Sequence, residues 1–309
     1  MAYKKKILVF GGTGMLGSKL VETLANSKNF ELSATFRQTA KVDNIFKSPN
    51  CIKWIPFEII STNYSELKNF VCNFDYVFNA TGAIPQKFDS KNIENLTNII
   101  LANSLFPSLL NNLCADLNVK LFTIGTDCVF SGERGNYFEN DLCDPSDVYG
   151  VSKYLGERIS AQTKIIRVSI VGCDGNSNAS LLNWFLNQPN SAKIKGYVNH
   201  FWNGITTVHF SKLIEKIIED DLEFDHLTHF LPRDSVTKYE LLKIFASRFN
   251  RNDIEIIPYT VPDRVNRVLN TLSPARNQDL WRIIGYSEVP SIDMLIGELA
   301  LDHKNKQFN

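Results

Sequence analysis

Tyr149 and Lys153 are the residues of this chain whose types and spacing most clearly suggest chemistry. Side chains four positions apart on a helix lie on one face, so a helix here would place the phenol beside the ammonium group. A neighbouring positive charge favours the ionised phenol and lowers its pKa from about 10. Such a phenol can donate a proton to a carbonyl oxygen while a hydride arrives from elsewhere. The pair therefore predicts carbonyl reduction, although this spacing also occurs by chance in many helices.

A glycine-rich turn near the amino terminus could hold the hydride donor. The apolar run Lys6–Phe10 leads into Gly11-Gly12-Thr13-Gly14-Met15-Leu16-Gly17, and an amphipathic stretch follows. Glycine lets the backbone turn tightly and approach a pyrophosphate, which then sits at the positive end of the next helix. In this order the motif predicts a dinucleotide site, and a tight turn without a ligand is the alternative. The expected contacts are Gly11, Gly14, Met15, Leu16 and Gly17.

The end of the second expected strand bears on the choice of dinucleotide. An acid at that place binds the ribose 2′-hydroxyl of NADH, whereas an arginine accommodates the 2′-phosphate of NADPH. Arg37 stands there, and Lys41 follows soon after. We therefore expect NADPH, with NADH as an alternative, unless Arg37 is only a solvated surface charge. Further expected contacts are Glu58 with the adenine amino group and Ala80, Thr81 and Gly82 along the ribose.

Strand and helix patterns alternate through the first half of the chain. The alternation predicts an α/β fold with a Rossmann-type, doubly wound parallel sheet covered on both faces. Near Gly172 the regularity stops, and short helices mix with irregular segments. We expect an NAD(P)-binding domain over residues 1–171 and a smaller, mostly substrate-binding region over 172–309, with a strand and helix near 205–222 returning to the first domain. The expected strands are Lys6–Phe10, Leu32–Phe36, Ile52–Phe57, Tyr76–Ala80, Lys120–Ile124 and Lys164–Val168, and the main helices Leu16–Ala25, Tyr64–Cys72, Ile93–Leu117 and Val148–Ala161.

The composition narrows the class of protein. With 309 residues, of which 44% are hydrophobic, the chain can bury a large core. Its 33 basic and 33 acidic residues argue against a nucleic-acid partner or a polybasic membrane patch, and no apolar run reaches the roughly 18 residues of a membrane span. Six scattered cysteines suggest reduced thiols in a cytoplasmic enzyme. We expect no metal, because His226 and His229 lack a second cluster of ligands.

Several motifs in one order are far more specific than any of them alone. They are Gly11-x-x-Gly14-x-x-Gly17, Asn79-Ala80-Thr81-Gly82, Asn103-Ser104-Leu105-Phe106-Pro107, Gly125-Thr126-Asp127-Cys128-Val129-Phe130-Ser131-Gly132, and Tyr149-Gly150-Val151-Ser152-Lys153 followed by Gly156-Glu157. With these motifs the chain resembles the extended short-chain dehydrogenase/reductases, and within them the dTDP-4-dehydrorhamnose reductase branch. The resemblance covers residues 5–170 well and the rest loosely.

The resemblance implies NADPH-dependent reduction of the 4-keto group of a nucleotide-diphospho-deoxy-sugar for surface polysaccharide. Thr126 would hydrogen-bond the keto oxygen, Tyr149 would supply its proton, and Lys153 would bind the nicotinamide ribose. In many relatives the helix bearing Tyr149 pairs with the preceding long helix in a dimer interface, which leaves a homodimer open. The resemblance adds Asn103, Tyr149 and Lys153 to the cofactor contacts, and Asp127, Cys128, Trp202, Arg264 and Arg267 as substrate candidates.

Cys128 departs from the pattern of the reductase branch, which usually carries tyrosine there. Sugar-nucleotide 4,6-dehydratases carry glutamate, so Cys128 disfavours dehydration. GDP-fucose synthases carry cysteine, which works with a histidine to epimerise the sugar before reduction, and a tuned thiol could act in this way. The loop that holds their histidine reads Gly172–Ser180 here and has none. A bifunctional epimerase/reductase therefore stays an alternative to a packing role for Cys128.

The carboxyl-terminal part leaves further alternatives open. Trp202 could pack over the substrate or within a core, and Arg264 or Arg267 could hold the diphosphate through planar, bidentate donors or be solvated charges. Relatives of this branch also include the regulatory subunit of methionine adenosyltransferase. A non-catalytic NADP-binding subunit is therefore the alternative from a different class of protein.

Overall fold

The computed structural model describes residues 3–37, 52–59, 63–84, 92–174 and 180–308, so Lys41 lies outside the described residues. The chain divides into two compact units. Unit 1 comprises Met1–Val129, Pro145–Arg167 and Ile214–Thr228, and unit 2 comprises Phe130–Asp144, Val168–Leu213 and His229–Asn309.

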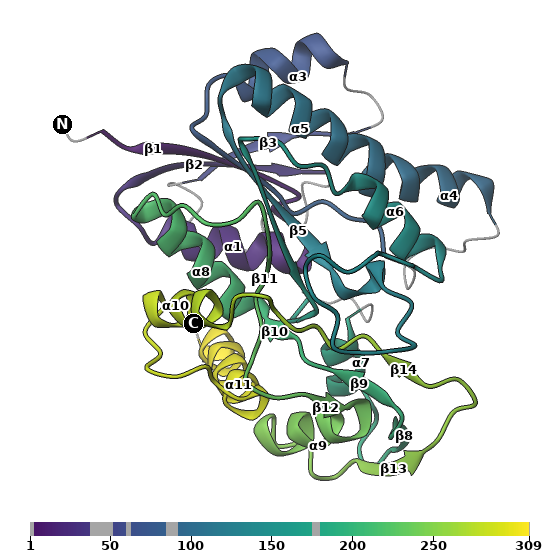
Figure 1. Ribbon diagram of the computed structural model, residues 1–309. Coiled ribbons are helices and arrows are strands. Elements are labelled where there is room, and N and C mark those ends of the chain that lie inside the picture. Colours follow the sequence, from purple (N-terminus) through teal and green to yellow (C-terminus); the bar gives the residue numbers. More distant parts are fainter. Residues whose placement is uncertain (1–2, 38–51, 60–62, 85–91, 175–179, 309) are drawn as a thin grey trace. The chain divides into compact units, whose positions relative to one another are not determined.

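A seven-stranded sheet organises unit 1, with the strand order β11-β6-β5-β4-β1-β2-β3 (Figure 1). The pairs β2–β3, β1–β2, β1–β4 and β4–β5 are parallel. The order 3-2-1-4-5-6 is that of the Rossmann fold and confirms the predicted doubly wound α/β class. The strands are β1 Lys5–Phe10, β2 Phe30–Phe36, β3 Ile52–Pro56, β4 Tyr76–Asn79, β5 Lys120–Thr126, β6 Thr163–Val168 and β11 Leu227–His229.

Helices cover the two faces of this sheet, with α1 on one side and α5 on the other (Figure 1). Apolar side chains from β1 and α5, among them Leu8, Phe10 and Leu110, are buried in a common core. Burial of such side chains contributes roughly 1.5–3 kcal/mol each to folding. The helices of unit 1 are α1 Met15–Ala25, α3 Tyr64–Val71, α4 Ile93–Ile100, α5 Phe106–Leu117 and α6 Val148–Gly156.

Two expected helices differ from the structure. The helix expected over Ile93–Leu117 is interrupted by a π-helical turn, Leu101–Leu105. Pro107, which lacks a backbone N–H, follows this turn near the start of α5, and such π turns are frequent at functional sites. The helix expected over Val148–Ala161 ends at Gly156, because Glu157 leaves the helical conformation at ψ 91°.

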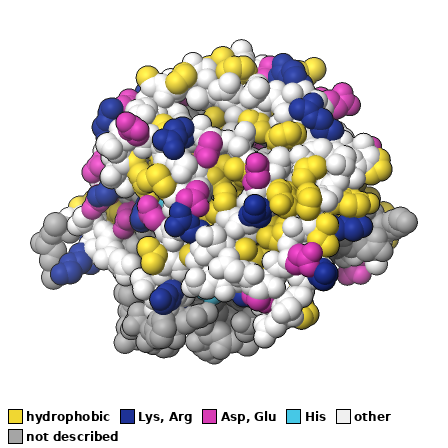
Figure 2. Space-filling view, turned by 90° about the horizontal axis from the view of Figure 1, so that it is seen from below, with side chains coloured by type: hydrophobic (Ala, Val, Ile, Leu, Met, Phe, Trp, Pro, Cys, Tyr) yellow, Lys and Arg dark blue, Asp and Glu magenta, His cyan; other side chains and the backbone are white. Residues whose placement is uncertain are grey.

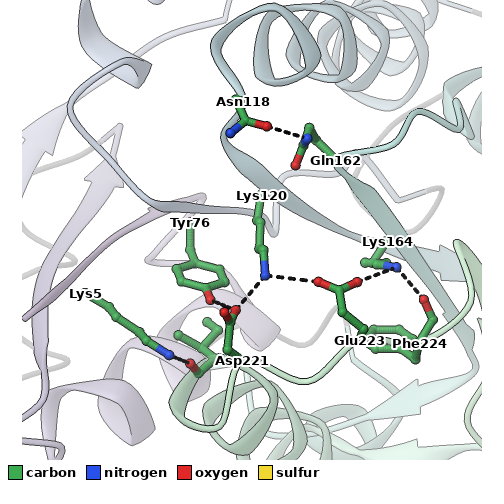
Figure 3. Close-up of polar contacts among 10 residues, drawn as sticks. Lys5, Tyr76, Asn118, Lys120, Gln162, Lys164, Asp221, Glu223 and Phe224 are labelled. Carbon is green, nitrogen blue, oxygen red and sulfur yellow. Dashed lines mark hydrogen bonds and ion pairs between the residues drawn. The ribbon is translucent and has the colours of Figure 1, made fainter.

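A polar network ties the segment Ile214–Thr228 to the amino ends of the strands (Figure 3). The Lys120 ammonium binds Asp221 at 2.5 Å and Glu223 at 3.0 Å, and the Tyr76 hydroxyl also bonds Asp221. Lys5 donates to the carbonyl oxygen of Ile218 at 2.5 Å, where a cation stabilises the end of a helix. Because ligands of doubly wound sheets bind at the carboxyl ends of the strands, this network has a structural role.

Unit 2 is built from small sheets and helices around its own apolar core. Phe185, Trp202, Phe245 and Ile296 are among its buried side chains. The sequence led us to expect irregular segments after the short helices, whereas the structure adds two helices, α10 and α11. The elements are β7 Ile170–Val171, α7 Leu181–Leu186, β8 Lys193–Tyr197, β9 His200–Trp202, β10 Ile205–Thr206, α8 Thr207–Glu219 (shared with unit 1), β12 Val236–Thr237, α9 Lys238–Arg248, β13 Glu255–Tyr259, β14 Val265–Asn266, α10 Pro274–Ile283 and α11 Ile292–Phe308.

A buried histidine joins α8 to α11 within unit 2. His209 Nδ1 lies 2.6 Å from the Thr206 hydroxyl, and Nε2 lies 2.8 Å from the Tyr286 hydroxyl and 3.2 Å from a Glu298 oxygen. Burial lowers the pKa of His209, although the hydrogen bond with Glu298 opposes this. The same bond lowers the pKa of Glu298 to about 2. The stability of unit 2 should therefore depend on pH through this cluster.

Charges of both signs are mixed on the surface. Figure 2 shows basic and acidic side chains interspersed with apolar ones over the face that it draws. Within the described ranges, no helix combines the length and apolar character needed to cross a membrane. The same residues contain no group of three or more His, Cys, Asp and Glu side chains placed to hold a metal ion.

Candidate functional site

The glycine turn after β1 is held by backbone contacts too close for a side chain. The N–H of Gly11 donates to the Thr35 hydroxyl at 2.9 Å, and the N–H of Gly14 donates to the Gly11 carbonyl at 3.0 Å. Gly11 has φ +77°, which favours glycine. A Cβ on Gly17 would lie only 2.0 Å from the Gly11 carbonyl oxygen. The local sequence therefore has to be glycine for this turn to close.

The turn presents the amino end of α1. Gly14 is extended and supplies no capping side chain, and the first turn of α1, which starts at Met15, holds no acidic residue. Leu16 is buried beneath the turn and Met15 is half-buried. Backbone N–H groups and the helix dipole at such an end attract an anion. The arrangement suits a pyrophosphate group without a compensating side chain.

The loop after β4 adjoins this turn. The Ala80 N–H donates to the Phe10 carbonyl at 3.0 Å, and a Cβ on Gly11 would lie 3.0 Å from the Ala80 carbonyl oxygen. Asn79 is buried and accepts hydrogen bonds from the Thr81 N–H and hydroxyl at 3.1 and 2.6 Å. β1 and β4 are neighbours at the point where the strand order reverses, and ligands bind at such switch points.

Arg37 and Glu58 lie at the same edge of the sheet. Both side chains are exposed; Arg37 directly follows β2, and Glu58 lies two residues after the end of β3. The Phe57 N–H donates to the Phe36 carbonyl at 3.0 Å, which holds the two strand ends together. The structure therefore brings both expected adenosine contacts to the carboxyl edge that carries the glycine turn.

Asn103 links the β4 loop to α6 from the π-helical turn. Its amide nitrogen donates to the Ala83 carbonyl at 2.9 Å and to the Ser152 hydroxyl at 3.0 Å, and its oxygen accepts from the Ala83 N–H at 2.9 Å. The Ser152 hydroxyl donates in turn to the Tyr149 carbonyl at 2.8 Å. Asn103 is 1% exposed, so all of these bonds are shielded from water. The sequence did not single out Ser152, although it stands inside the Tyr149–Lys153 motif.

Two glycines let α6 approach its neighbours closely. A Cβ on Gly150 would lie 2.1 Å from the carbonyl oxygen of Cys128, and a Cβ on Gly156 would lie 1.9 Å from that of Asn103. Asp147 starts the helix by accepting a 2.7 Å bond from the Gly150 N–H. The close contact sets the Tyr149 side of α6 against the turn that follows β5.

Thr126 and Tyr149 meet in this contact. The Thr126 hydroxyl lies near enough to the Tyr149 phenol to influence its ionisation, and the Thr126 oxygen accepts from the Cys128 N–H at 3.2 Å. Burial raises the pKa of Tyr149, with a further increase from the Cys128 charge, while the nearby Thr126 hydroxyl opposes the change. The lowered pKa that the Tyr149–Lys153 spacing led us to expect is thus not found, because desolvation of the phenolate dominates.

Lys153 points to the strand below the phenol. Lys153 is 8% exposed, and its ammonium group donates to the Ile124 carbonyl at 2.9 Å. Burial lowers the pKa of Lys153, and the charges of Glu157 and Cys128 counteract this. The lysine is therefore held as a fixed donor close to the end of β5.

Glu157 and Arg167 form a buried ion pair that sequence reasoning missed. The shortest contact is 2.6 Å, and the two side chains are 7% and 4% exposed. A Cβ on Gly125 would lie 2.6 Å from Arg167 Cγ, so Gly125 makes room for the pair beside β5. Glu157 follows the Tyr149–Lys153 motif in the sequence, but no feature of the sequence connected it with Arg167.

The other substrate candidates occupy different surroundings. Asp127 and Cys128 are half-buried in a short 3-10 turn, Asp127–Val129, with the sulfur 3.8 Å from an Asp127 oxygen. In unit 2, Trp202 is 3% exposed and donates to the Ser169 hydroxyl at 2.8 Å, a placement that favours the packing interpretation.

The two arginine candidates also lie in unit 2. Arg264 is exposed and stacks over the Phe201 ring at 5.3 Å, and Arg267 donates to the Phe130 carbonyl at 2.9 Å. Arg267 is therefore partly engaged in holding its own unit, while the guanidinium of Arg264 reaches solvent.

Comparisons with known proteins agree with this fold. The dTDP-4-dehydrorhamnose reductase of Clostridium acetobutylicum is 18% identical, with a TM-score of 0.71 over 97% of this chain and 99% of that one. The reductase of Bacillus anthracis, solved in complex with NADP, is 19% identical with a TM-score of 0.71 over the same shares. Subunit beta of methionine adenosyltransferase 2 from Danio rerio is 26% identical over 152 residues, which are 45% of this chain and 46% of that protein.

The match to curated relatives is thus partial, spanning less than half of their length. A sequence model of a protein family covers far more of this chain, namely residues 5–268. Together with the Rossmann order and the Thr126, Tyr149 and Lys153 constellation, this match shows that the chain belongs to the RmlD substrate binding domain family, among the extended short-chain dehydrogenase/reductases.

Proposed function

We propose that this protein reduces the 4-keto group of a nucleotide-diphospho-deoxy-sugar with NADPH. The observation that carries the proposal is the approach of the Thr126 hydroxyl to the Tyr149 phenol, with Lys153 one helical turn away on the same helix. Two hydroxyl groups that converge on one point can both bond a carbonyl oxygen placed there. The dTDP-4-dehydrorhamnose reductases of similar fold support the choice of substrate class.

Thr126, Tyr149 and Lys153 each have a different role in the proposed reaction. Tyr149 donates the proton, since its raised pKa keeps the phenol protonated in the resting enzyme. Thr126 orients the keto oxygen by a hydrogen bond, and Lys153 binds a ribose hydroxyl of the cofactor while holding α6 on β5. When bound, NADPH supplies the hydride.

The glycine turn and Arg37 support NADPH as the cofactor. The Gly11–Gly17 contact leaves a cradle that any Cβ would fill, which fits a pyrophosphate at the start of α1. The exposed Arg37 guanidinium suits a 2′-phosphate, and the similar Bacillus anthracis reductase was solved with NADP. Glu58, Ala80, Thr81, Gly82 and Asn103 complete the proposed cofactor contacts.

The remaining expectations belong to the same proposal. Residues 1–171 would form the cofactor domain and most of 172–309 the substrate region, where Arg264 or Arg267 would hold the diphosphate by bidentate bonds. The reaction would take place in the cytoplasm, and its product would be used to build surface polysaccharide.

A homodimer is supported by the apolar surface of α4 and α6. Exposed side chains include Ile93 and Leu105 at the two ends of α4 and its π-helical turn, and Val151, Leu155 and Ile159 on and after α6. Exposed apolar side chains gathered on neighbouring helices often mark an interface. Sedimentation of the purified protein tests this part, and a Leu155→Glu variant should shift a dimer towards monomer.

Turnover with a panel of 4-keto nucleotide sugars tests the central proposal. We expect NADPH absorbance to fall with at least one of them, with product carrying a new hydroxyl at C4. Tight NADPH binding without turnover on the whole panel would instead favour the regulatory alternative. Running the reaction in deuterated water also reports on Cys128, because an epimerase would introduce deuterium at the carbons beside the ketone and a simple reductase would not.

A further inference from the structure

A thiol and an imidazole meet in unit 2 outside the site described above. The Cys173 sulfur lies 3.3 Å from Nδ1 of His303, within hydrogen-bonding distance for sulfur. Cys173 comes two residues after β7, and His303 lies near the end of α11. Both side chains are half-buried. The two residues are 130 positions apart, so only the tertiary fold brings them together.

The packing around Cys173 and His303 brings their side chains together. Gly172 brings the chain close to α8, where a Cβ would lie 2.4 Å from the Thr207 hydroxyl oxygen. Cys173 then packs against the core of unit 2. On α11 the buried residues Ile292, Ile296 and Leu299 recur at helical spacing, and His303 continues their stripe. The pair is thus held by two rigid elements rather than by chance contact.

His303 is placed to accept a proton. Burial lowers the pKa of His303, Lys306 lowers it further, and Asp302 raises it. The ring of Phe249, directly after α9, has its centroid 5.8 Å from that of His303, and Arg248 is paired with Asp293 at the other end of α11. A neutral imidazole next to a thiol can take its proton and leave the nucleophilic thiolate.

Other cysteines provide internal comparisons. Burial raises the pKa of Cys114 to about 12, which makes its thiol inert. Cys72 is exposed, and its thiol donates to the Asn69 carbonyl at 3.3 Å, a group that cannot take up the proton. A buried thiol and an exposed thiol without a base are therefore present in the same chain.

We propose that Cys173 and His303 form a reactive thiol–imidazole pair, and that Cys173 is a site of covalent modification by soft electrophiles and peroxides. With an alkyl halide, the sulfur forms a bond to carbon as halide leaves, and the thiol proton passes to His303 and then to water. With hydrogen peroxide, the sulfur attacks one oxygen and the O–O bond breaks. The departing hydroxide takes the proton from His303 as water, so sulfur is oxidised to sulfenic acid and the peroxide is reduced.

Site-resolved alkylation of the full chain with iodoacetamide tests this pair. A thiol without a base loses about tenfold in rate for each pH unit below its pKa of about 8.5. A pair that shares one proton keeps a constant thiolate fraction until the imidazole itself is protonated. Measured by mass spectrometry, the Cys173 rate relative to Cys72 should rise at least about tenfold between pH 8.5 and 6.5.

Variants of α11 distinguish an effect of His303 on Cys173 reactivity from an effect of solvent exposure alone. His303→Gln should make the pH profile of Cys173 parallel to that of Cys72, while Lys304→Gln, an exposed neighbour on α11, should leave it unchanged. Treatment with hydrogen peroxide and a sulfenic-acid trap should label Cys173 before Cys72 at pH 6.5. Parallel profiles of the two thiols in the wild-type protein would overturn the proposal, and this comparison does not depend on the folding of any variant.

Discussion

The ammonium group of Lys153 donates a 2.9 Å hydrogen bond to the carbonyl oxygen of Ile124, two residues before Thr126. The bond fastens the helix that carries Tyr149 to the strand that carries Thr126. The distance between the two hydroxyl groups is therefore set by a buried contact within unit 1. Several consequences of this geometry can be measured.

Removing the Tyr149 hydroxyl should abolish proton donation without harming the fold. Tyr149→Phe is expected to lower kcat/KM by about 10²- to 10⁴-fold, the usual contribution of a positioned general acid. NADPH binding should persist. Tyr154→Phe is the matched control, because Tyr154 lies on the same helix and is 42% exposed. Equal activity of the two variants would exclude Tyr149 as the proton donor.

Adding a methyl group at Gly17 should open the cofactor turn. The new Cβ would lie 2.0 Å from the Gly11 carbonyl oxygen, and such overpacking costs about 1–3 kcal/mol. Gly17→Ala should therefore lower the melting temperature and weaken NADPH binding in a fluorescence titration. In the control Gly297→Ala, the nearest atom lies at 3.6 Å and α11 should gain up to about 1 kcal/mol. Unchanged NADPH affinity in Gly17→Ala would contradict the proposed pyrophosphate cradle.

The charge of Glu157 should affect both stability and the pH dependence of cofactor binding. Glu157→Gln leaves Arg167 buried without its carboxylate, a loss of about 3–5 kcal/mol in the free energy of unfolding. The Glu157 charge also raises the pKa of Lys153, so its removal lowers that pKa. The ammonium form is then lost at lower pH, and the alkaline decline in NADPH affinity should move to lower pH. Glu157→Asp retains the charge and should move it less; coincident curves for Gln and wild type would exclude the coupling.

Acid should destabilise unit 2 through the His209 cluster. Because the pKa of His209 is lowered in the fold, the unfolded chain binds the proton first, and stability falls as pH drops below about 6.5. The pKa of Glu298, lowered to about 2, gives a second loss as pH falls from about 4.3 towards that value. His209→Gln should flatten the first decline in melting temperature, leaving the contribution of His303, whose pKa is also lowered. The half-buried His200, changed to Gln, serves as the control, and equal slopes in both variants would refute the assignment.

Much of the fold and part of the candidate site could be predicted from local features of the sequence. The glycine turn was recognisable because the tight backbone approach at Gly11 and Gly17 permits only one residue type. The strands of the parallel sheet were recognisable as apolar runs because both faces are covered. A spacing of four residues was enough to place Tyr149 and Lys153 on one helix, since that relation lies within a single turn.

Other features were decided by the tertiary structure, because they depend on groups far apart in the chain. The pKa of Tyr149 follows from burial, whose effect exceeds that of the expected lysine neighbour and reverses the direction. The partner of Glu157, directly after α6, is Arg167, ten residues away on β6. The meeting of Cys173 with His303 joins positions 130 residues apart. Local periodicity records which face of an element is buried, but only the packed chain determines what that face meets and how strongly water is excluded there.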